Sequence, residues 1–430
     1  MKKILLIIFS LSLLVAEAQD KMTIDEAIEI ALKNNYDIQI SKKDVEIAKT
    51  NNTSGNAGML PDIGISGSGS YALKNVNQKV TGGSEVNYSG LGTTNLGAGA
   101  ELSWTIFDGG KMFIAKSRLN EVEAMGELKF REQLLRTLSE VITSYYNVVK
   151  QKQQLNSIRQ TIEFNLERVK IAQAGFNSGS LKKTDLLQAK IDLNVNKENA
   201  INQEYAILNA KRELAKLLSM SVDEQIEVSD SIEIKYEPVR EELYSKLYKN
   251  NINLQIFEKQ VGIEKLYLKE SYRSQLPRVN FNGGYYFSGS TNNQGAILSN
   301  RSFGPQIGGN INIPVFQSGD LRRQINLSKI GIEKAEFNLE SLKLETGTEL
   351  LNSLTQFENN KELLEIEKDN YQLAKENLEI SLQRMRLGEA TSLEVRLAQQ
   401  DFEQSATRLI NFLYNLKIAE TRLKQLTGDL

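Results

Sequence analysis

Along most of the chain, apolar residues recur every three or four positions, which is the spacing of one face of a helix. This regularity is the pattern of coiled-coil packing, so it predicts long helices that lie side by side. In the first half the stripe comprises Leu135, Leu138, Ile142, Tyr145 and Val149, then Ile158, Ile162, Leu166, Val169 and Phe176. In the second half it comprises Ile332, Ala335, Leu339 and Leu342, then Leu350, Leu354 and Phe357, then Leu378, Leu382 and Met385.

Two windows alternate between apolar and small or polar residues instead, which predicts strands. Each run has about the 10 residues of a transmembrane β-strand with an apolar outside and a polar lumen. We therefore predict hairpins over 62–106 and 278–315. Four strands of a soluble sheet are the alternative. Two features favour strands that lie in a membrane. The strands are separated by polar connectors that resemble extracellular loops, Leu73–Thr93 and Gly289–Ser302. Aromatic residues also gather near the strand ends, as they do at membrane interfaces. These aromatics are Tyr71, Trp104, Phe107, Tyr286, Phe303 and Phe316.

Glycine and proline mark the same division of the chain. Most of the 29 glycines lie in the two alternating windows, and all 5 prolines avoid the interval 62–237. Helix breakers are therefore scarce outside the two alternating windows, and the segments between these windows can form very long helices. A helix from Lys111 to Gly175 would be roughly 100 Å long at about 1.5 Å per residue.

The chain also repeats itself. Lys33-Asn34-Asn35 recurs as Lys249-Asn250-Asn251, and Leu60-Pro61 recurs as Leu276-Pro277 at the same shift. The matches continue to the end of the chain after one shortening, which falls where a variable loop would lie. Each half is too long for a solenoid repeat, so we infer duplication of a half-domain.

The first residues resemble an export signal. Lys2 and Lys3 precede an apolar run that ends at Ala16-Glu17-Ala18, a small-x-small cleavage pattern. An uncleaved N-terminal anchor is the alternative. The predicted division is a signal peptide at 1–18, a first repeat at 19–218, a linker at 219–237 and a second repeat at 238–430.

Composition narrows the possible chemistry. The chain has no cysteine and no histidine, so thiolate metal sites, disulfides and the commonest acid–base residue are excluded. A net charge of −2 gives no support for nucleic-acid binding. We predict no enzyme activity, no cofactor and no metal.

Four strands cannot close a membrane barrel, because the smallest such barrels have about 8 strands. The chain must therefore pool strands with copies of itself. Three copies would form a 12-stranded barrel and four copies a 16-stranded one, and cyclic symmetry suits a tunnel.

In these features the sequence resembles the TolC-type outer membrane efflux proteins over nearly its whole length. Leu60-Pro61 and Leu276-Pro277 match the family pattern where the chain enters the barrel, and Trp104 to Gly110 match it where the chain leaves. Pro314 to Gly319 match more weakly. The family residues at these points are Pro61, Pro277, Phe107, Gly110, Phe316 and Gly319.

The resemblance implies a mainly α-helical mixed fold: a periplasmic α-barrel of long coiled-coil helices plus four transmembrane strands per chain in a trimeric 12-stranded β-barrel. It also implies a homotrimer in the outer membrane of a Gram-negative bacterium, in contact with outer-membrane lipid and with its helical part in the periplasm. The implied partners are a periplasmic adaptor and an inner-membrane transporter. The implied function is a passive exit duct for small molecules or proteins. Ser219 to Glu237 would belong to an equatorial belt.

Two helix turns carry the residues that the resemblance assigns to function. Turn residues expected to meet the adaptor are Ser178, Gly179, Leu387 and Gly388. Residues expected at a periplasmic aperture are Asp185, Glu394, Thr184 and Arg386. The glycines also suit simple turns with positive φ, and both acids also suit helix caps. In the second copy of the turn, Ala390 stands where the family pattern has a basic residue, and Leu397 stands where it has a second acid. Arg386 or Arg396 would have to take over their role.

Two other functions compete with a duct. A structural coiled-coil protein of the cell envelope explains the helices but not the strands or the signal. A carboxylate-based hydrolase is the other alternative, but no pair of acidic residues in the chain is flanked by sequence that would form a pocket. A requirement for detergent on extraction from membranes separates the duct from both.

Overall fold

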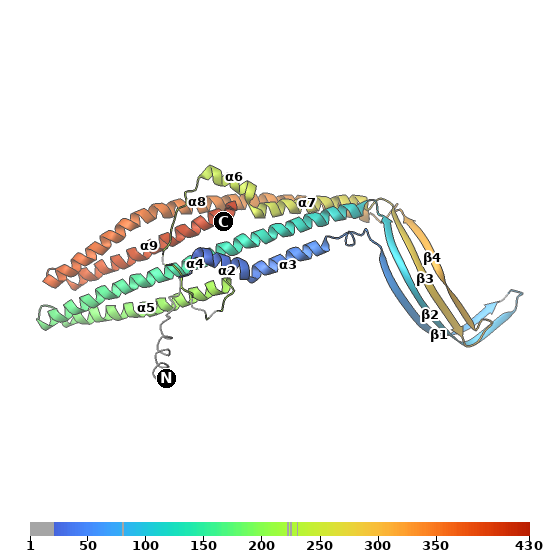
Figure 1. The fold of residues 1–430 in the computed structure, drawn as a ribbon, viewed down its shortest axis with the longest axis horizontal. Coiled ribbons are helices and arrows are strands. Elements are labelled where there is room, and N and C mark those ends of the chain that lie inside the picture. The colour runs from blue at the N-terminus through green and yellow to red at the C-terminus, as the bar shows by residue number, and fades with distance from the viewer. Residues whose placement is uncertain (1–20, 80, 222, 224–225, 230) are drawn as a thin grey trace, which may run out of the picture. The chain divides into compact units, whose positions relative to one another are not determined.

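The computed structural model describes residues 21–79, 81–221, 223, 226–229 and 231–430. The predicted signal peptide at 1–18 therefore lies outside the described residues. The order of elements repeats, with two helices, a hairpin and two long helices in each half (Figure 1).

Helices make up most of the described chain, as the apolar periodicity predicts. In the first half they are α2 (Ile24–Asn34), α3 (Tyr36–Asn51), α4 (Lys111–Asn177) and α5 (Lys183–Leu217). In the second half they are α6 (Arg240–Asn250), α7 (Ile252–Arg273), α8 (Asp320–Leu387) and α9 (Ser392–Thr427). Among the described residues, no helix has the length and apolarity needed to cross a lipid bilayer.

The strands form one antiparallel sheet in the order β1-β2-β3-β4. Their bounds are β1 (Asp62–Lys79), β2 (Glu85–Phe107), β3 (Arg278–Asn292) and β4 (Ser299–Asn312). The pairing register separates two faces: Ile63, Leu102, Gly283 and Ile307 lie level on one, and Gly64, Glu101, Gly284 and Gln306 on the other. Alternation therefore predicted correctly which side chains share a face, except at Ile106, which falls in a register shift between Thr105 and Phe107.

Strand pairing extends further toward the loop of each hairpin than the sequence suggested. Leu73–Thr93 and Gly289–Ser302 were expected to be long loops, but pairing continues to Lys79 opposite Glu85 and to Thr291 opposite Ser299. That expectation was wrong because backbone hydrogen bonds can extend an antiparallel hairpin even where neither face is apolar. A register shift between Lys74 and Val76 interrupts this extension.

The second hairpin ends earlier than predicted. β4 ends at Asn312, so Ile313 and Val315 lie outside the strand although they continue its alternation. Pro314 explains the difference, since proline has no N–H to donate to the strand ladder.

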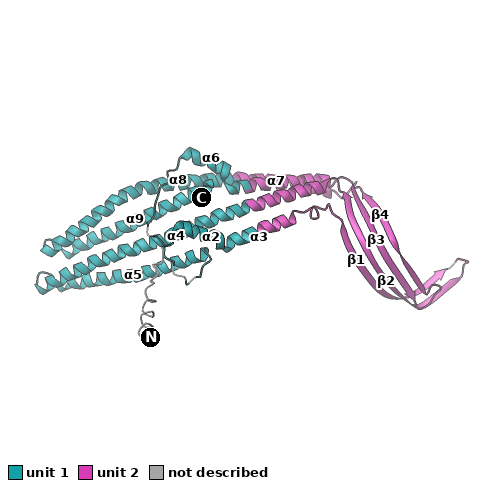
Figure 2. Ribbon diagram, in the orientation of Figure 1, with its two compact units in different colours: residues 1–43, 128–255, 341–430 teal, residues 44–127, 256–340 magenta. Residues whose placement is uncertain are grey.

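Two compact units divide the described chain, and each contains parts of both halves (Figure 2). Unit 1 comprises the described residues within 1–43, 128–255 and 341–430, and unit 2 comprises those within 44–127 and 256–340. Unit 2 holds the sheet. In unit 1, separate clusters of buried apolar side chains hold α4 and α5 near the linker, α8 and α9 near α6, and the two helix turns.

The predicted helix stripes are only partly buried. Leu350, Leu354, Phe357, Leu378, Leu382 and Met385 are all buried, as predicted. Leu166 and Phe176 are instead exposed, and α4 buries the neighbouring face, which carries Thr161, Asn165 and Arg168. That part of the prediction was wrong because the partners of Arg168, described below, compensate the burial of its charge, and a count of apolar positions cannot detect them.

Candidate functional site

The two helix turns have the same backbone geometry. Gly179 ends the turn after α4 with φ +81°, and Gly388 ends the turn after α8 with φ +78°. In each, the N–H after the glycine donates back to a carbonyl five residues earlier, from Ser180 to Gly175 at 2.8 Å and from Glu389 to Arg384 at 2.9 Å. This is a Schellman motif, and its left-handed residue strongly favours glycine.

Both predicted aperture acids cap the helices that follow the turns. The Glu394 carboxylate accepts from Thr391 N–H at 3.0 Å, while Thr391 Oγ1 accepts from Glu394 N–H at 3.2 Å. The Asp185 carboxylate accepts from Lys182 N–H at 3.2 Å. Thr184, beside Asp185, is exposed. Capping is therefore a role of both acids in this structure, and a role at an aperture would be additional.

Arg386 joins the two halves of unit 1 near these turns. Its Nη2 lies 2.5 Å from Glu167 Oε1, so α8 is tied to α4. The exposed Leu387 and Ser178 stand beside their turn glycines. Leu181, after the first turn, packs on the same apolar cluster that contains Ala390 of the second. The structure thus brings both predicted tip turns together.

Sequence reasoning missed a buried arginine between the helical hairpins. Arg168 is only 1% exposed. Its Nη2 donates to Asp192, and its Nη1 donates to Gln399 Oε1 at 3.1 Å. A buried charge requires such partners, so this contact fixes α4 against α5 and α9. Neither its position nor its residue type distinguished Arg168 from the exposed arginines of the helices.

The predicted barrel residues lie at strand ends or in the short connectors between strands and helices. Pro61 and Pro277 immediately precede β1 and β3, and Phe107 is the last residue of β2. Gly110 and Gly319 take φ +82° and +79° just before the start of α4 and α8. Phe316 lies between β4 and α8, and its side chain is 83% exposed.

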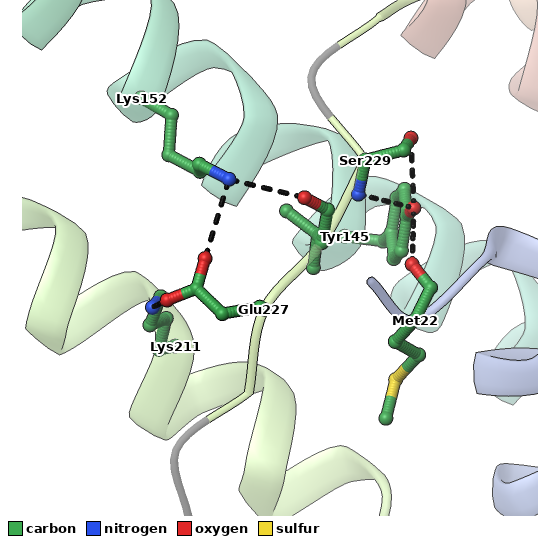
Figure 3. A network of polar contacts seen from close by, with 7 residues as sticks. Met22, Tyr145, Lys152, Lys211, Glu227 and Ser229 are labelled. Carbon is green, nitrogen blue, oxygen red and sulfur yellow. Dashed lines mark hydrogen bonds and ion pairs between the residues drawn. The ribbon is translucent and has the colours of Figure 1, made fainter. Parts of the chain in front are cut away.

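A polar network holds the described part of the linker on α4 and α5 (Figure 3). Tyr145 Oη donates to Met22 O at 2.8 Å and accepts from Ser229 N–H at 3.2 Å. Lys152 and Lys211 both contact the Glu227 carboxylate, Lys152 at 3.3 Å. Burial raises the pKa of Glu227, but the hydrogen bonds and charges of the two lysines outweigh it, so its pKa lies below the ordinary value for a glutamate.

This depressed pKa predicts an acid-sensitive linker. The contribution of Glu227 to stability is fully present above the ordinary pKa of a glutamate, and it is lost as the pH falls through the lower pKa of the folded state. The protection of the backbone amides at 226–229 against hydrogen exchange, expressed relative to their intrinsic exchange rate at each pH, should therefore fall on acidification through that range. Glu227→Gln should remove this pH dependence. Glu213→Gln, which removes an exposed carboxylate, should leave it intact, and equal behaviour of the two variants would contradict the assignment.

A model of the family described as "Outer membrane efflux protein" matches residues 27–219 and 243–429. The two matches cover both halves and most of the chain. The chain belongs to the outer membrane efflux protein family. The resemblance deduced from the duplicated motifs is thus confirmed, and so is the mainly helical fold with a four-stranded antiparallel sheet.

Solved outer membrane channels and outer membrane proteins share this fold. The Campylobacter jejuni CmeC outer membrane channel matches with a TM-score of 0.80 and 19% identity, over 94% of this chain and 85% of that one. The Vibrio cholerae outer membrane protein VceC matches with 0.77 and 15%, over 94% and 96%. The open state of the Neisseria gonorrhoeae MtrE outer membrane channel matches with 0.71 and 14%, over 94% and 88%. Comparison with curated protein sequences gives no match.

Proposed function

We propose that this outer membrane efflux protein is the exit duct of a tripartite efflux or type I secretion system. It is a homotrimer, and it conducts small molecules or proteins passively from a periplasmic pump complex to the exterior. No step of this function requires catalysis or a cofactor in the chain, because the partner transporter supplies the energy.

The open sheet is the observation that carries this proposal. Within the described residues, β1 pairs only with β2, and β4 pairs only with β3, so each edge leaves backbone groups unpaired. One face also exposes large apolar side chains, with Ile65 89% and Ile307 75% exposed. A bilayer accepts the apolar face but not the open edges, so β4 of one copy must pair with β1 of the next.

Helices α5 and α8 each expose an apolar face that is not buried within the chain. On α8, apolar residues repeat at heptad spacing but remain exposed, whereas its other face is buried in unit 1. These exposed residues are Ile366, Leu373, Ile380 and Leu387. On α5 the exposed apolar residues are Leu187, Ile191, Val195, Ile201, Tyr205 and Leu208. Such seams suit helix pairing between copies, which supports a helical tunnel.

The proposal also gives each segment a location. The signal at 1–18 directs export, and the sheet lies in the outer membrane of a Gram-negative cell. The long helices of the repeats at 19–218 and 238–430 lie in the periplasm. The linker at 219–237 joins the repeats in an equatorial belt, supported by the buried Ile226 and Val228.

The turns would form the periplasmic tip of this duct. Ser178, Gly179, Leu387 and Gly388 would contact an adaptor that joins the duct to an inner-membrane transporter. All four are exposed, and Leu387 is 74% exposed, which suits a docking surface. Asp185, Thr184 and Glu394 would lie at the aperture, and the Arg386–Glu167 ion pair would help to hold it closed.

Glu394→Gln should weaken the preference of the channel for cations. Three copies would place three carboxylates around one axis, and this negative potential attracts cations in a narrow throat. Glutamine can still accept the capping hydrogen bond from Thr391 N–H, so the substitution removes the charge alone. Planar-bilayer recordings should show reduced cation selectivity, and unchanged selectivity of an intact trimer would leave Glu394 as a helix cap only.

Reconstitution tests the duct itself. Protein extracted from membranes should require detergent and should form conducting pores in a planar bilayer. A structural coiled-coil protein of the envelope would stay soluble without detergent and would conduct no current.

A further inference from the structure

Unit 1 contains a polar cavity lined by α4, α5 and α9 and open to solvent on one side, which is distinct from the turns and the linker. Its volume is about 430 Å³, and Ile158 is the one apolar side chain among the described residues that line it. Hydroxyl, amide and carboxylate groups supply the rest of the wall, including Thr161, Asn196, Gln203 and Glu403. Pockets for small molecules have volumes of roughly 300–1,000 Å³, but most have apolar walls. This wall selects a hydrophilic occupant.

One wall group is buried without a partner. Thr161 is 1% exposed, and its Oγ1 has no hydrogen bond within the described structure. Asn165 lies one helical turn further along α4, is fully buried, and has neither amide atom paired among the described residues. Buried polar groups are nearly always satisfied, so the unpaired Thr161 Oγ1 offers an acceptor for an occupant at this wall.

The charge of the cavity points to the kind of occupant. Glu403 Oε1 accepts from Gln399 Nε2 at 2.8 Å and from Asn196 Nδ2 at 3.4 Å. No lysine or arginine is among the described residues that line the cavity. The neighbouring Arg168 donates to Asp192 and Gln399 instead. The carboxylate therefore has amide donors but no counter-charge in the wall.

We propose that this cavity binds a small hydrophilic ammonium compound. Its ammonium group donates to the Glu403 carboxylate and supplies the missing positive charge. Further N–H groups donate to Thr161 Oγ1 and to amide oxygens of the wall. A divalent metal ion is a poorer fit, because the wall provides a single carboxylate and such ions usually take several charged oxygen ligands.

Calorimetric titration of the purified trimer in detergent with 1,4-diaminobutane tests the proposal. We expect saturable binding, and at least tenfold weaker binding to Glu403→Gln. Asp401→Asn is the matched control, because Asp401 is exposed and lies two residues earlier, on the opposite side of α9. Its affinity should equal that of the parent. The neutral 1,4-butanediol, of similar length, should not bind.

Thr161→Val provides a second variant, since it replaces the hydroxyl with a methyl group of similar size. It should weaken diamine binding several-fold, and it decides the question if Glu403→Gln does not fold. Absence of saturable diamine binding at millimolar concentration would overturn the proposal. So would equal affinity of the parent and Thr161→Val, of Glu403→Gln and Asp401→Asn, or of the diamine and the diol. Binding is measured without transport, so this result is independent of channel activity.

Discussion

Replacing Ile65 by lysine should nearly abolish the assembled protein in the outer membrane. Ile65 is 89% exposed on the apolar face of β1. A lysine facing lipid costs roughly 2–4 kcal/mol at mid-bilayer and less towards the interfaces. Because the penalty recurs in every copy, we expect at least a tenfold loss of trimer, measured by immunoblotting of outer-membrane fractions without heating.

Ser66→Lys is the matched control for this substitution. Ser66 is the next residue of β1, and it lies opposite Gly99 on the small, polar face of the sheet. A lysine there would project into a water-filled lumen and should leave assembly nearly unchanged. Equal loss from both substitutions would show that the faces are assigned wrongly, and equal tolerance would show that neither face meets lipid.

The double substitution Gly179→Val and Gly388→Val should abolish export while trimers remain in the membrane. Both glycines have positive φ, and a non-glycine residue there costs roughly 1–2 kcal/mol, with β-branched residues among the least tolerated. No atom lies within 4 Å of an added Cβ at either position, so the change affects the turn backbone more than packing. Export of a dye or drug by intact cells, together with trimer content, measures the effect.

A second pair of glycines controls for strain alone. Gly82 and Gly83 also have positive φ and no atom within 4 Å of an added Cβ, but they lie in the β1–β2 loop. Their replacement by valine should preserve export. Normal export by the Gly179 and Gly388 variant would contradict adaptor docking at these turns, and loss in both double variants would attribute the defect to backbone strain.

The periodicity of the sequence was sufficient to predict the elements of the fold. Alternation assigned Ile63 and Ile307 to one face and Gly64 to the other, because side-chain direction in a strand follows directly from position. Helix breakers marked the ends of α4 and α8 for the same local reason. Strand ends were harder to predict, since pairing to Lys79 depends on the partner strand and not on local apolar residues.

The candidate site was predictable only in part. The turns at Gly179 and Gly388 have a local signature, and so has the capping box at Thr391 and Glu394. The ion pair of Arg386 with Glu167 joins residues of different halves, so no spacing in the sequence revealed it. The Glu403 cavity likewise depends on three helices that only the fold brings together.

The subunit number of the mature protein tests the proposed duct most directly. The mass of the particle extracted from outer membranes in mild detergent can be measured by light scattering or by native mass spectrometry. Open edges at β1 and β4 predict an assembly of several chains, and the proposed 12-stranded barrel sets the number at three. The particle should dissociate on heating and should not be extractable without detergent. A monodisperse, water-soluble monomer would contradict the channel.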